Sequence, residues 1–555
     1  MQRTNTAAAD RAVVFQHDEV GLAGMVEQVL AAQGEARGWG EEPLRPAWWR
    51  RIPGKALRLL VGAPRRAEMQ RRRSLKKGAA WLRRELAGSA KPVLVYVVPF
   101  DIWALRTGGA QRIAGLAQAL SREFHVYILT PTRRVRDFSV RRLGLDCRLL
   151  GVPTEPEFEA SVKGRDAGAV FFAFADMVDR LPGVRRLLDQ MAPQAAAWAF
   201  THPTAWPVVR PFIRPGQAVL YDVHDDYGQF LQQAYGDREL ERSRRLVSLE
   251  CDVLKQVQVA ACCTVADLSA VRGRNPDSRT RLLVVPNGVD VKTCRMAGPG
   301  EVRRNRLSAG LSRPMVTFMG AHHGPNREAA DFISFELAPA FPQAVFVIMG
   351  LNSDAIRGRD GGGPGNNVVV TGPVPEKVKE AVMTLSEVAL APMRSGTGSS
   401  LKIPDYVAHG NIVVGTPIGL RGFEELTSFP SVMATDDVAG ALAAVLARLE
   451  REPEACDEAC RQAREWVETT LDWSVAAKPL VEAMREEGER GGGGSPSTGS
   501  GRGGAEGAEK EQEGEQPCGL TETQRAQRGK AATKRIGTSG NSQAGKQETQ
   551  ENKKG

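Results

Sequence analysis

Short runs of apolar residues recur along the middle of the chain and alternate with longer amphipathic segments. The runs are rich in valine, isoleucine and alanine, as in strands buried on both faces, while the segments between them have helical spacing. The first clear unit begins after Lys91, where PVLVYVVPF precedes a Gly-Gly turn, a helix with Ile113, Leu116 and Leu120, and a second strand, HVYILTPT. This order predicts a right-handed βαβ unit with parallel strands.

The same alternation continues for most of the chain. Further strands are predicted at AVFFAF, AAAWAF, AVLYDVHDD, VAACCTVA and RLLVV, and after the turn signal at Pro286–Gly288 at PMVTFMG, AVFVIMG, NVVVTG, EVALAP and IVVGT. The predicted fold class is α/β, with two doubly wound parallel sheets in Rossmann-like domains. The predicted parts are a basic extension (1–90), an N-terminal domain (91–280), a C-terminal domain (281–487) and a disordered tail (488–555) that has little to bury.

The positive charge of the chain is concentrated in the N-terminal extension. The net charge is +9, and the segment 50–85 alone contains thirteen basic and two acidic residues. Trp48, Trp49 and Trp81 lie among these charges, so the segment 46–85 could associate with an anionic membrane surface. A solvated basic helix packed loosely on the main body, or a disordered arm, would have the same composition. Nucleic acid is not expected as a partner, because no nucleic-acid motif accompanies the charge.

Cysteine usage and hydropathy favour a cytoplasmic location. The eight cysteines form no C-x-x-C pair, which is typical of reduced thiols. We find neither an apolar run long enough to cross a membrane nor a secretory signal pattern at the start of the sequence. The expected location is therefore the cytoplasm, with peripheral association at the inner face of the membrane if the basic segment binds lipid.

The segment 391–422 combines the features of a phosphate-binding turn. A buried strand ends before SGTGSS, and a helix is predicted to start near Ser399, with Lys402 in its first turn and Asp405 one turn later. Glycine allows close backbone approach, a helix start favours an anion, and Lys402 could add a charge. Asp405 could accept hydrogen bonds from a ribose. An ordinary strand, turn and helix would show the same local pattern.

Four segments in a fixed order carry a wider resemblance. They are PFDIWALRTGGAQRIAGLAQAL, LYDVHDD, VVPNGVDV and GTGSSLKIPDYVAHGNIVVGTPIG. With them the chain resembles the retaining GT-B glycosyltransferases of glycosyltransferase family 4, the group 1 type, over roughly residues 92–484. The resemblance implies two domains facing a central cleft. It also implies transfer of a sugar, with retention, from a nucleotide-diphosphate sugar to a hydroxyl of a glycan, lipid-linked or small-molecule acceptor, as in polysaccharide or glycolipid assembly.

The resemblance also implies roles for individual residues. His224 and Asp225 are the implied catalytic residues, with His224 orienting the sugar and Asp225 setting its tautomer or binding an acceptor hydroxyl. His202 is the implied acceptor contact. The implied donor-binding residues are Gly108, Gly109, Arg327, Thr397, Gly398, Ser399, Ser400, Lys402 and Asp405. Asp405 takes the place of the second glutamate of the family's E-x7-E pattern. No cofactor and no metal are expected.

The sequence departs from the family pattern at two places. Thr397 stands where the first acid of E-x7-E is usual, and Ala321 stands where an arginine often reaches the phosphates, with His322, His323 and Arg327 nearby. Two alternatives to a working transferase therefore stay open. One is a nucleotide-sugar epimerase on the same fold, and the other is a binding or scaffold protein that has lost the chemistry.

Overall fold

The apolar runs of the first half of the chain form one sheet in the computed structural model, with the order β1-β4-β5-β3-β2-β6-β7-β8-β9. The structure describes residues 41–42, 63–162, 167–176, 179, 181–226, 240–308, 310, 312–321, 324–351, 356 and 365–492, all within one compact unit, Met1–Ser495. The strands are β1 (Glu41–Glu42), β2 (Val93–Val97), β3 (His125–Thr132), β4 (Ser139–Gly144), β5 (Cys147–Pro153), β6 (Ala195–Thr201), β7 (Ala218–Val223), β8 (Val259–Cys262) and β9 (Arg281–Val284). Strands β2, β3 and β5–β9 pair in parallel, and β4 is antiparallel to β5 and β1.

The first sheet is doubly wound. From β2 the chain goes through α4 to β3 and β5 on one side, then returns to β6 and continues outward through β7, β8 and β9. The winding therefore reverses between β2 and β6, which is where ligands bind in open parallel sheets. The loop after β2 leads to α4, and the loops after β6 and β7 carry His202 and His224. The sequence thus brings its candidate residues to the carboxyl ends of neighbouring strands.

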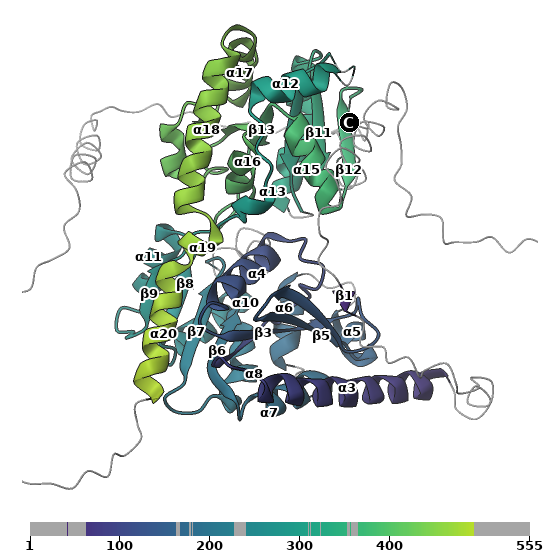
Figure 1. Cartoon of the computed structure of the whole chain (residues 1–555), viewed down its shortest axis with the longest axis vertical. Helices are drawn as coiled ribbons and strands as arrows, with labels where there is room; N and C mark the ends of the chain where they lie inside the picture. The colour runs from purple at the N-terminus through teal and green to yellow at the C-terminus, as the bar shows by residue number, and fades with distance from the viewer. Residues whose placement is uncertain are drawn as a thin grey trace, which may run out of the picture. The chain divides into compact units, whose positions relative to one another are not determined.

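Helices cover both faces of this sheet (Figure 1). They are α3 (Ala63–Ala87), α4 (Gly108–Leu120), α5 (Pro156–Val162), α6 (Ala167–Asp176), α7 (Pro182–Met191), α8 (Trp206–Val209), α10 (Leu240–Leu254) and α11 (Val265–Arg274), with short 3-10 turns at Pro203–Ala205 and Arg210–Phe212. Ile113, Leu116 and Leu120 of α4 are fully buried, as their helical spacing predicts.

The second sheet is entirely parallel, with the order β12-β11-β10-β13-β14-β15. Its strands are β10 (Met315–Met319), β11 (Val345–Met349), β12 (Val368–Gly372), β13 (Val388–Ala391), β14 (Ile412–Gly415) and β15 (Val432–Ala434). Its helices are α12 (Pro299–Ser308), α13 (Gly324–Phe332), α14 (Ala338–Ala340), α15 (Glu376–Leu385), α16 (Lys402–His409), α17 (Val438–Arg451) and α18 (Pro453–Thr470), with a π-helical segment at Ile333–Leu337 and 3-10 turns at Val291–Thr293 and Glu424–Ser428. Buried side chains fill both faces, as expected for a parallel sheet between helices.

The last helices return the chain to the first sheet. After α18 and the short α19 (Trp473–Ala476), α20 (Lys478–Gly492) contacts α4, β7 and β8. Figure 1 shows α20, in yellow, beside β7. Leu480, Val481 and Met484 are buried with α4 in the same core cluster, and Trp473 packs against Gly115 and Gly288, where a Cβ atom would overlap its ring. Helix α20, the last described helix, therefore forms part of the core of the first domain.

The fold class is confirmed, since two doubly wound α/β sheets follow one another as predicted, the first parallel except at β4 and the second parallel throughout. One predicted strand is wrong, because AVFFAF lies in the helix α6. A short continuous apolar run has no periodicity that separates a buried strand from a buried helix, so residue type alone misled the assignment. The strands β1, β4, β5 and β15 were not predicted. The burial pattern of β4 is irregular, and β1 and β15 contain only two and three residues.

Three segments lie outside the domains to which the sequence assigned them. β9 and α20 fell within the predicted C-terminal domain but pack in the first sheet domain. Helix α3 fell within the predicted extension, yet Leu75, Leu82 and Leu86 are buried in the core of the first domain. In Figure 1, α3 runs beside α7, which it contacts. Trp48 and Trp49, and residues 493–555 of the predicted tail, lie outside the described residues.

Candidate active site

His224 is held by a buried carboxylate that the sequence did not single out. Its Nε2 lies 2.7 Å from Oδ2 of Asp222, which is fully buried. The Tyr96 hydroxyl donates to the same oxygen over 2.7 Å, and Arg112 Nε donates to Oδ1 over 2.9 Å. Burial alone would raise the pKa of Asp222, but Arg112 and His224 lower it well below its usual range. An ionised carboxylate only accepts, so His224 donates from Nε2 and keeps an unprotonated Nδ1 when neutral.

The glycine turn at the start of α4 lies against this histidine. Thr107 caps α4, and its side chain accepts from the Ala110 amide. A Cβ atom at Gly109 would lie 3.2 Å from His224 Nδ1, and one at Gly108 would lie 3.2 Å from Leu401 Cδ1. Glycine therefore allows the turn to approach both the histidine and the segment that precedes α16 closely, because a Cβ atom at either position would make a tight contact.

The predicted phosphate turn, residues 395–401, has a fixed backbone shape. Gly396 and Gly398 have φ of 126° and 65°, conformations that favour glycine. Arg421 donates from Nε to the Gly398 carbonyl and from Nη1 to the Gly396 carbonyl, each over 2.6 Å. A Cβ atom at Gly398 would overlap the carboxylate of Asp225. This turn of the second domain therefore lies directly against the end of β7 in the first.

Asp225 contacts the turn rather than the histidine ring. Its carboxylate hydrogen-bonds the side chain of Thr397, the residue that replaces the family's usual acid. Burial, followed by the charge of Asp267, raises the pKa of Asp225 to about 6, even though His224, Thr397 and Arg421 oppose the rise. The prediction that Asp225 sets the tautomer of His224 is wrong, because Asp222 occupies that position. A carboxyl group with such a pKa can exchange a proton near neutral pH.

Ser399 is connected to the first domain through Asn287 of the VVPNGVD segment. Asn287 donates from Nδ2 to Ser399 Oγ over 2.9 Å, and its Oδ1 accepts from Arg112 Nη1 over 3.1 Å. Arg112 also donates to the Val285 carbonyl over 2.9 Å. Asn287 and Arg112 are both buried. The segment that joins the two sheet domains therefore contacts the turn on one side and the Asp222 carboxylate on the other.

Helix α16 starts at Lys402, later than predicted, and offers few amides to an anion. The Ile403 amide donates to the Ser400 carbonyl over 3.0 Å, and Pro404 has no N–H. Of the amide N–H groups that a helix start normally presents to a phosphate, that of Ile403 is thus occupied and that of residue 404 is absent. Any anion at this turn would depend mainly on side-chain charge.

Lys402 supplies that charge from a buried position. The residue is 8% exposed, and its Nζ donates to Asn326 Oδ1 over 2.9 Å and lies 4.4 Å from the centre of the Phe318 ring. Burial lowers the pKa of Lys402 to about 7. Within the described part of the chain, no carboxylate forms a salt bridge with it. The buried ammonium form therefore carries a charge that no described carboxylate neutralises, and an anionic ligand would stabilise it.

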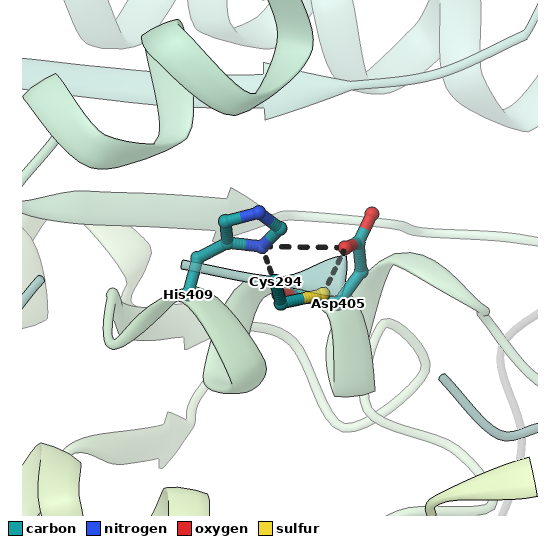
Figure 2. Close-up of side chains that lie close together, drawn as sticks. All are labelled: Cys294, Asp405 and His409. Carbon is teal, nitrogen blue, oxygen red and sulfur yellow. Dashed lines mark hydrogen bonds and ion pairs between the residues drawn. The ribbon is translucent and has the colours of Figure 1, made fainter. Parts of the chain in front are cut away.

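Asp405 has partners within the protein that the ribose prediction did not foresee. Its Oδ2 lies 3.0 Å from Lys379 Nζ, and its Oδ1 lies 3.3 Å from His409 Nδ1 and 3.8 Å from Cys294 Sγ. Figure 2 shows the side chains of Cys294, Asp405 and His409 directed toward one another. Burial would raise the pKa of Asp405, but Lys379 and His409 lower it well below its usual range. The carboxylate is thus committed to two cations, and the ribose contact predicted for it does not fit this arrangement.

The same three side chains are close enough to hold a metal ion by distance alone. Burial would lower the pKa of His409, but Asp405 and Cys294 raise it to about 10. His409 Nδ1 also lies 2.8 Å from the backbone oxygen of Asp405, which can only accept, so this nitrogen carries a proton. A protonated nitrogen cannot ligate a metal, and the Lys379 ammonium beside Asp405 would repel one. The cluster fits a buried ion-pair network.

Two further predicted site residues, His202 and Arg327, are respectively buried and exposed at the surface. His202 is fully buried, with φ of 65° and with Nδ1 2.8 Å from Thr204 Oγ1, so it cannot contact an acceptor in this conformation. Burial, reinforced by His224, lowers the pKa of His202 well below its usual value. Arg327 is exposed on α13, whereas the preceding Asn326 contacts Lys402. His322 and His323 lie outside the described residues.

Comparison with known proteins identifies the second domain. Residues 313–451, from β10 to α17, match the family model described as glycosyl transferases group 1. The segment contains the phosphate turn, Lys402 and Asp405. Residues 313–451 are a group 1 glycosyltransferase domain. The prediction of a glycosyltransferase enzyme is thereby confirmed.

Solved structures share the fold of the glycosyltransferase. A sucrose-phosphate synthase from Thermosynechococcus elongatus aligns at a TM-score of 0.54 and 16% identity, covering 71% of this chain and 98% of its own. A structure described as trehalose-6-phosphate from E. coli bound with UDP-2-fluoro glucose aligns at a TM-score of 0.51 and 12% identity. The alignment covers 71% of this chain and 99% of that one. No curated protein matches the chain by sequence. These likenesses establish the GT-B arrangement of two Rossmann-like domains.

None of the described helices is long and apolar enough to cross a membrane.

Proposed function

We propose that the glycosyltransferase moves a sugar from a nucleotide-diphosphate sugar to an acceptor hydroxyl, with retention and without a metal. The observation that carries the proposal is the buried ammonium of Lys402, which lacks a carboxylate partner among the described residues and lies in the group 1 domain. A diphosphate would supply the missing negative charge. The turn at Gly396–Ser400, shaped by Arg421, would lie along the phosphates.

The reaction that we propose follows from where charge develops. The bond between the anomeric carbon and the diphosphate breaks, the acceptor oxygen bonds to that carbon, and the acceptor proton ends on the released nucleoside diphosphate. Lys402 stabilises the diphosphate as its negative charge grows. His224, with Nδ1 facing the glycine turn of α4, accepts a hydrogen bond from a sugar hydroxyl and orients the ring. In this proposal Asp225, which hydrogen-bonds Thr397, binds the acceptor hydroxyl.

Product analysis tests the proposed function. Purified protein is incubated with UDP-, GDP- and ADP-sugars, and release of the nucleoside diphosphate is followed by chromatography in the presence of EDTA. UDP-glucose is the first donor to examine, because a structure with the same fold was solved with UDP-2-fluoro glucose. We expect release from at least one donor, slowly to water and faster with an acceptor, and a product with the anomeric configuration of the donor. Inverted product would disprove retention, and release that requires added divalent metal would disprove the metal-free reaction.

We also propose that the basic face of α3 associates with an anionic membrane at the cytoplasmic side, where a lipid-linked glycan would be the acceptor. Arg72, Arg73, Lys76 and Lys77 are exposed on α3, while Leu82 on its other face is fully buried. Since the apolar face is used for packing, binding would be electrostatic and weakened by salt.

Charge reversal tests the membrane proposal without removing the helix. Glutamate at positions 72, 73, 76 and 77 should abolish cosedimentation with vesicles that contain phosphatidylserine, and the wild type should lose binding as ionic strength rises. Binding that persists in the reversed variant, or at high salt, would contradict the proposal. Thermal unfolding of the variant checks that α3 still packs.

A further inference from the structure

A buried chain of polar contacts joins the phosphate turn to His224. It runs from Ser399 Oγ to Asn287 Nδ2 (2.9 Å), from Asn287 Oδ1 to Arg112 Nη1 (3.1 Å) and from Arg112 Nε to Asp222 Oδ1 (2.9 Å). It ends at the 2.7 Å contact between Asp222 Oδ2 and His224 Nε2. The members come from the segment before α16, the segment after β9, α4 and β7. Four separate parts of the chain thus meet in one network.

The central pair of the network, Arg112 and Asp222, is buried and held by several hydrogen bonds. Arg112 is 1% exposed and Asp222 is fully buried. Arg112 is also held by the carbonyls of Val285 at 2.9 Å and Ala261 at 3.4 Å, so its guanidinium has a single orientation fixed from several sides. A buried ion pair of this kind is weak evidence for stability, but its hydrogen bonds set the direction of both side chains. Asp222 is therefore fixed in place before any ligand binds.

We propose that Arg112 and Asp222 are positioning residues that hold His224 as its Nε2–H tautomer, and that Asn287 couples this pair to the phosphate turn. Nδ1 of His224 is then kept free of a proton and facing Gly109, where a sugar would be oriented. The role given to His224 rests on the proposed function. The tautomer and the coupling follow from this chain's own contacts and can be measured without turnover.

The tautomer is tested by NMR on protein labelled with ¹⁵N in the histidine rings, with the His224 signals assigned from a His224→Gln variant. We expect a protonated Nε2 and an unprotonated Nδ1 for His224 in the wild type near neutral pH. In Asp222→Asn this preference should be lost, whereas in the control Tyr96→Phe, which removes the other side-chain donor to Asp222 Oδ2, it should remain. A protonated Nδ1 in the wild type, or unchanged His224 signals in a folded Asp222→Asn variant, would overturn the proposal.

The coupling is tested with Asn287→Ala, which leaves the Arg112–Asp222 pair in place. UDP, GDP and ADP are titrated separately, and binding is detected by thermal stabilisation. We expect the nucleotide that binds to shift the His224 signals in the wild type and to shift them much less in Asn287→Ala at saturation. Equal shifts in the two proteins would refute the coupling. If none of the three nucleotides binds, the proposed function fails, and the tautomer measurement still decides the role of Asp222.

Kinetics separate positioning from structural support. With a donor that is turned over, Asp222→Asn should lower kcat by about 10²- to 10⁴-fold, the range for a histidine that loses its positioned role, while KM for the donor stays nearly constant. Arg112→Lys retains the charge but not the forked geometry and should show the same pattern more weakly. A rise in KM with unchanged kcat in both variants would show that the network supports donor binding rather than His224.

Discussion

A Lys402→Met variant is expected to bind nucleoside diphosphate about 10- to 100-fold more weakly than the wild type, the loss expected for one charge-assisted contact. Its Nζ is buried beside Asn326 and Phe318, and among the described residues it has no carboxylate partner. Methionine fills nearly the same volume without the charge, so the fold should be retained. The measurement is the shift in melting temperature with UDP, GDP or ADP, which for the wild type corresponds to about 2.7 kcal/mol when the ligand concentration is about 100 times Kd.

The stability of the ligand-free protein provides an internal check on this result. The pKa of Lys402 is lowered from 10.5 to about 7 by burial, so the folded state holds fewer protons than the unfolded state between these values. The contribution of Lys402 to the free energy of unfolding therefore rises as pH increases from about 7 toward 10.5. Lys402→Met should lose this rise and be no less stable than the wild type at neutral pH. Lys377→Met, at an exposed lysine on α15, is the matched control and should alter neither property.

His224→Ala is expected to lower kcat by about 10²- to 10⁴-fold, the range attributed to a positioned acid–base or hydrogen-bonding side chain. Thermal stabilisation by nucleoside diphosphate should be unchanged, because His224 contacts Asp222 and the glycine turn rather than Lys402 or Asn326. Lys402→Met should thus weaken nucleotide binding, whereas His224→Ala should lower turnover and leave nucleotide binding unchanged. Nucleotide release from the donor, measured at saturating donor, gives kcat. Turnover equal to that of the wild type would remove His224 from the catalytic site.

The alternation of apolar runs predicted most of the parallel strands of both sheets, because strands buried on two faces leave a strong signal in the sequence. It failed at AVFFAF, which forms α6, since a short apolar run fits either kind of element. It also failed at α3, where the many arginines concealed Leu75, Leu82 and Leu86 at helical spacing. The basic composition reflects the exposed face of α3, and the three leucines form its buried face.

The candidate site was predicted less completely than the fold, because its contacts join residues far apart in the sequence. Local patterns drew attention to Lys402 and the glycine turns, and the family resemblance drew attention to His224. They could not show that Asp222, rather than the adjacent Asp225, holds His224, or that Asp405 is paired with Lys379. Arg112 and Asn287 lie inside segments that the resemblance singled out, yet nothing in their spacing indicated that they contact each other.

The central claim is that a buried ammonium group receives the diphosphate of the donor. Calorimetric titration at pH 8, with whichever of UDP, GDP and ADP binds, in two buffers of different ionisation enthalpy, tests it most directly. Because the pKa of Lys402 is about 7 in the ligand-free protein, most of this group is neutral at pH 8 and must take up a proton to pair with phosphate. The account predicts uptake of close to one proton per nucleotide in the wild type and none in Lys402→Met. Tight binding without proton uptake, or equal uptake in the variant, would contradict it.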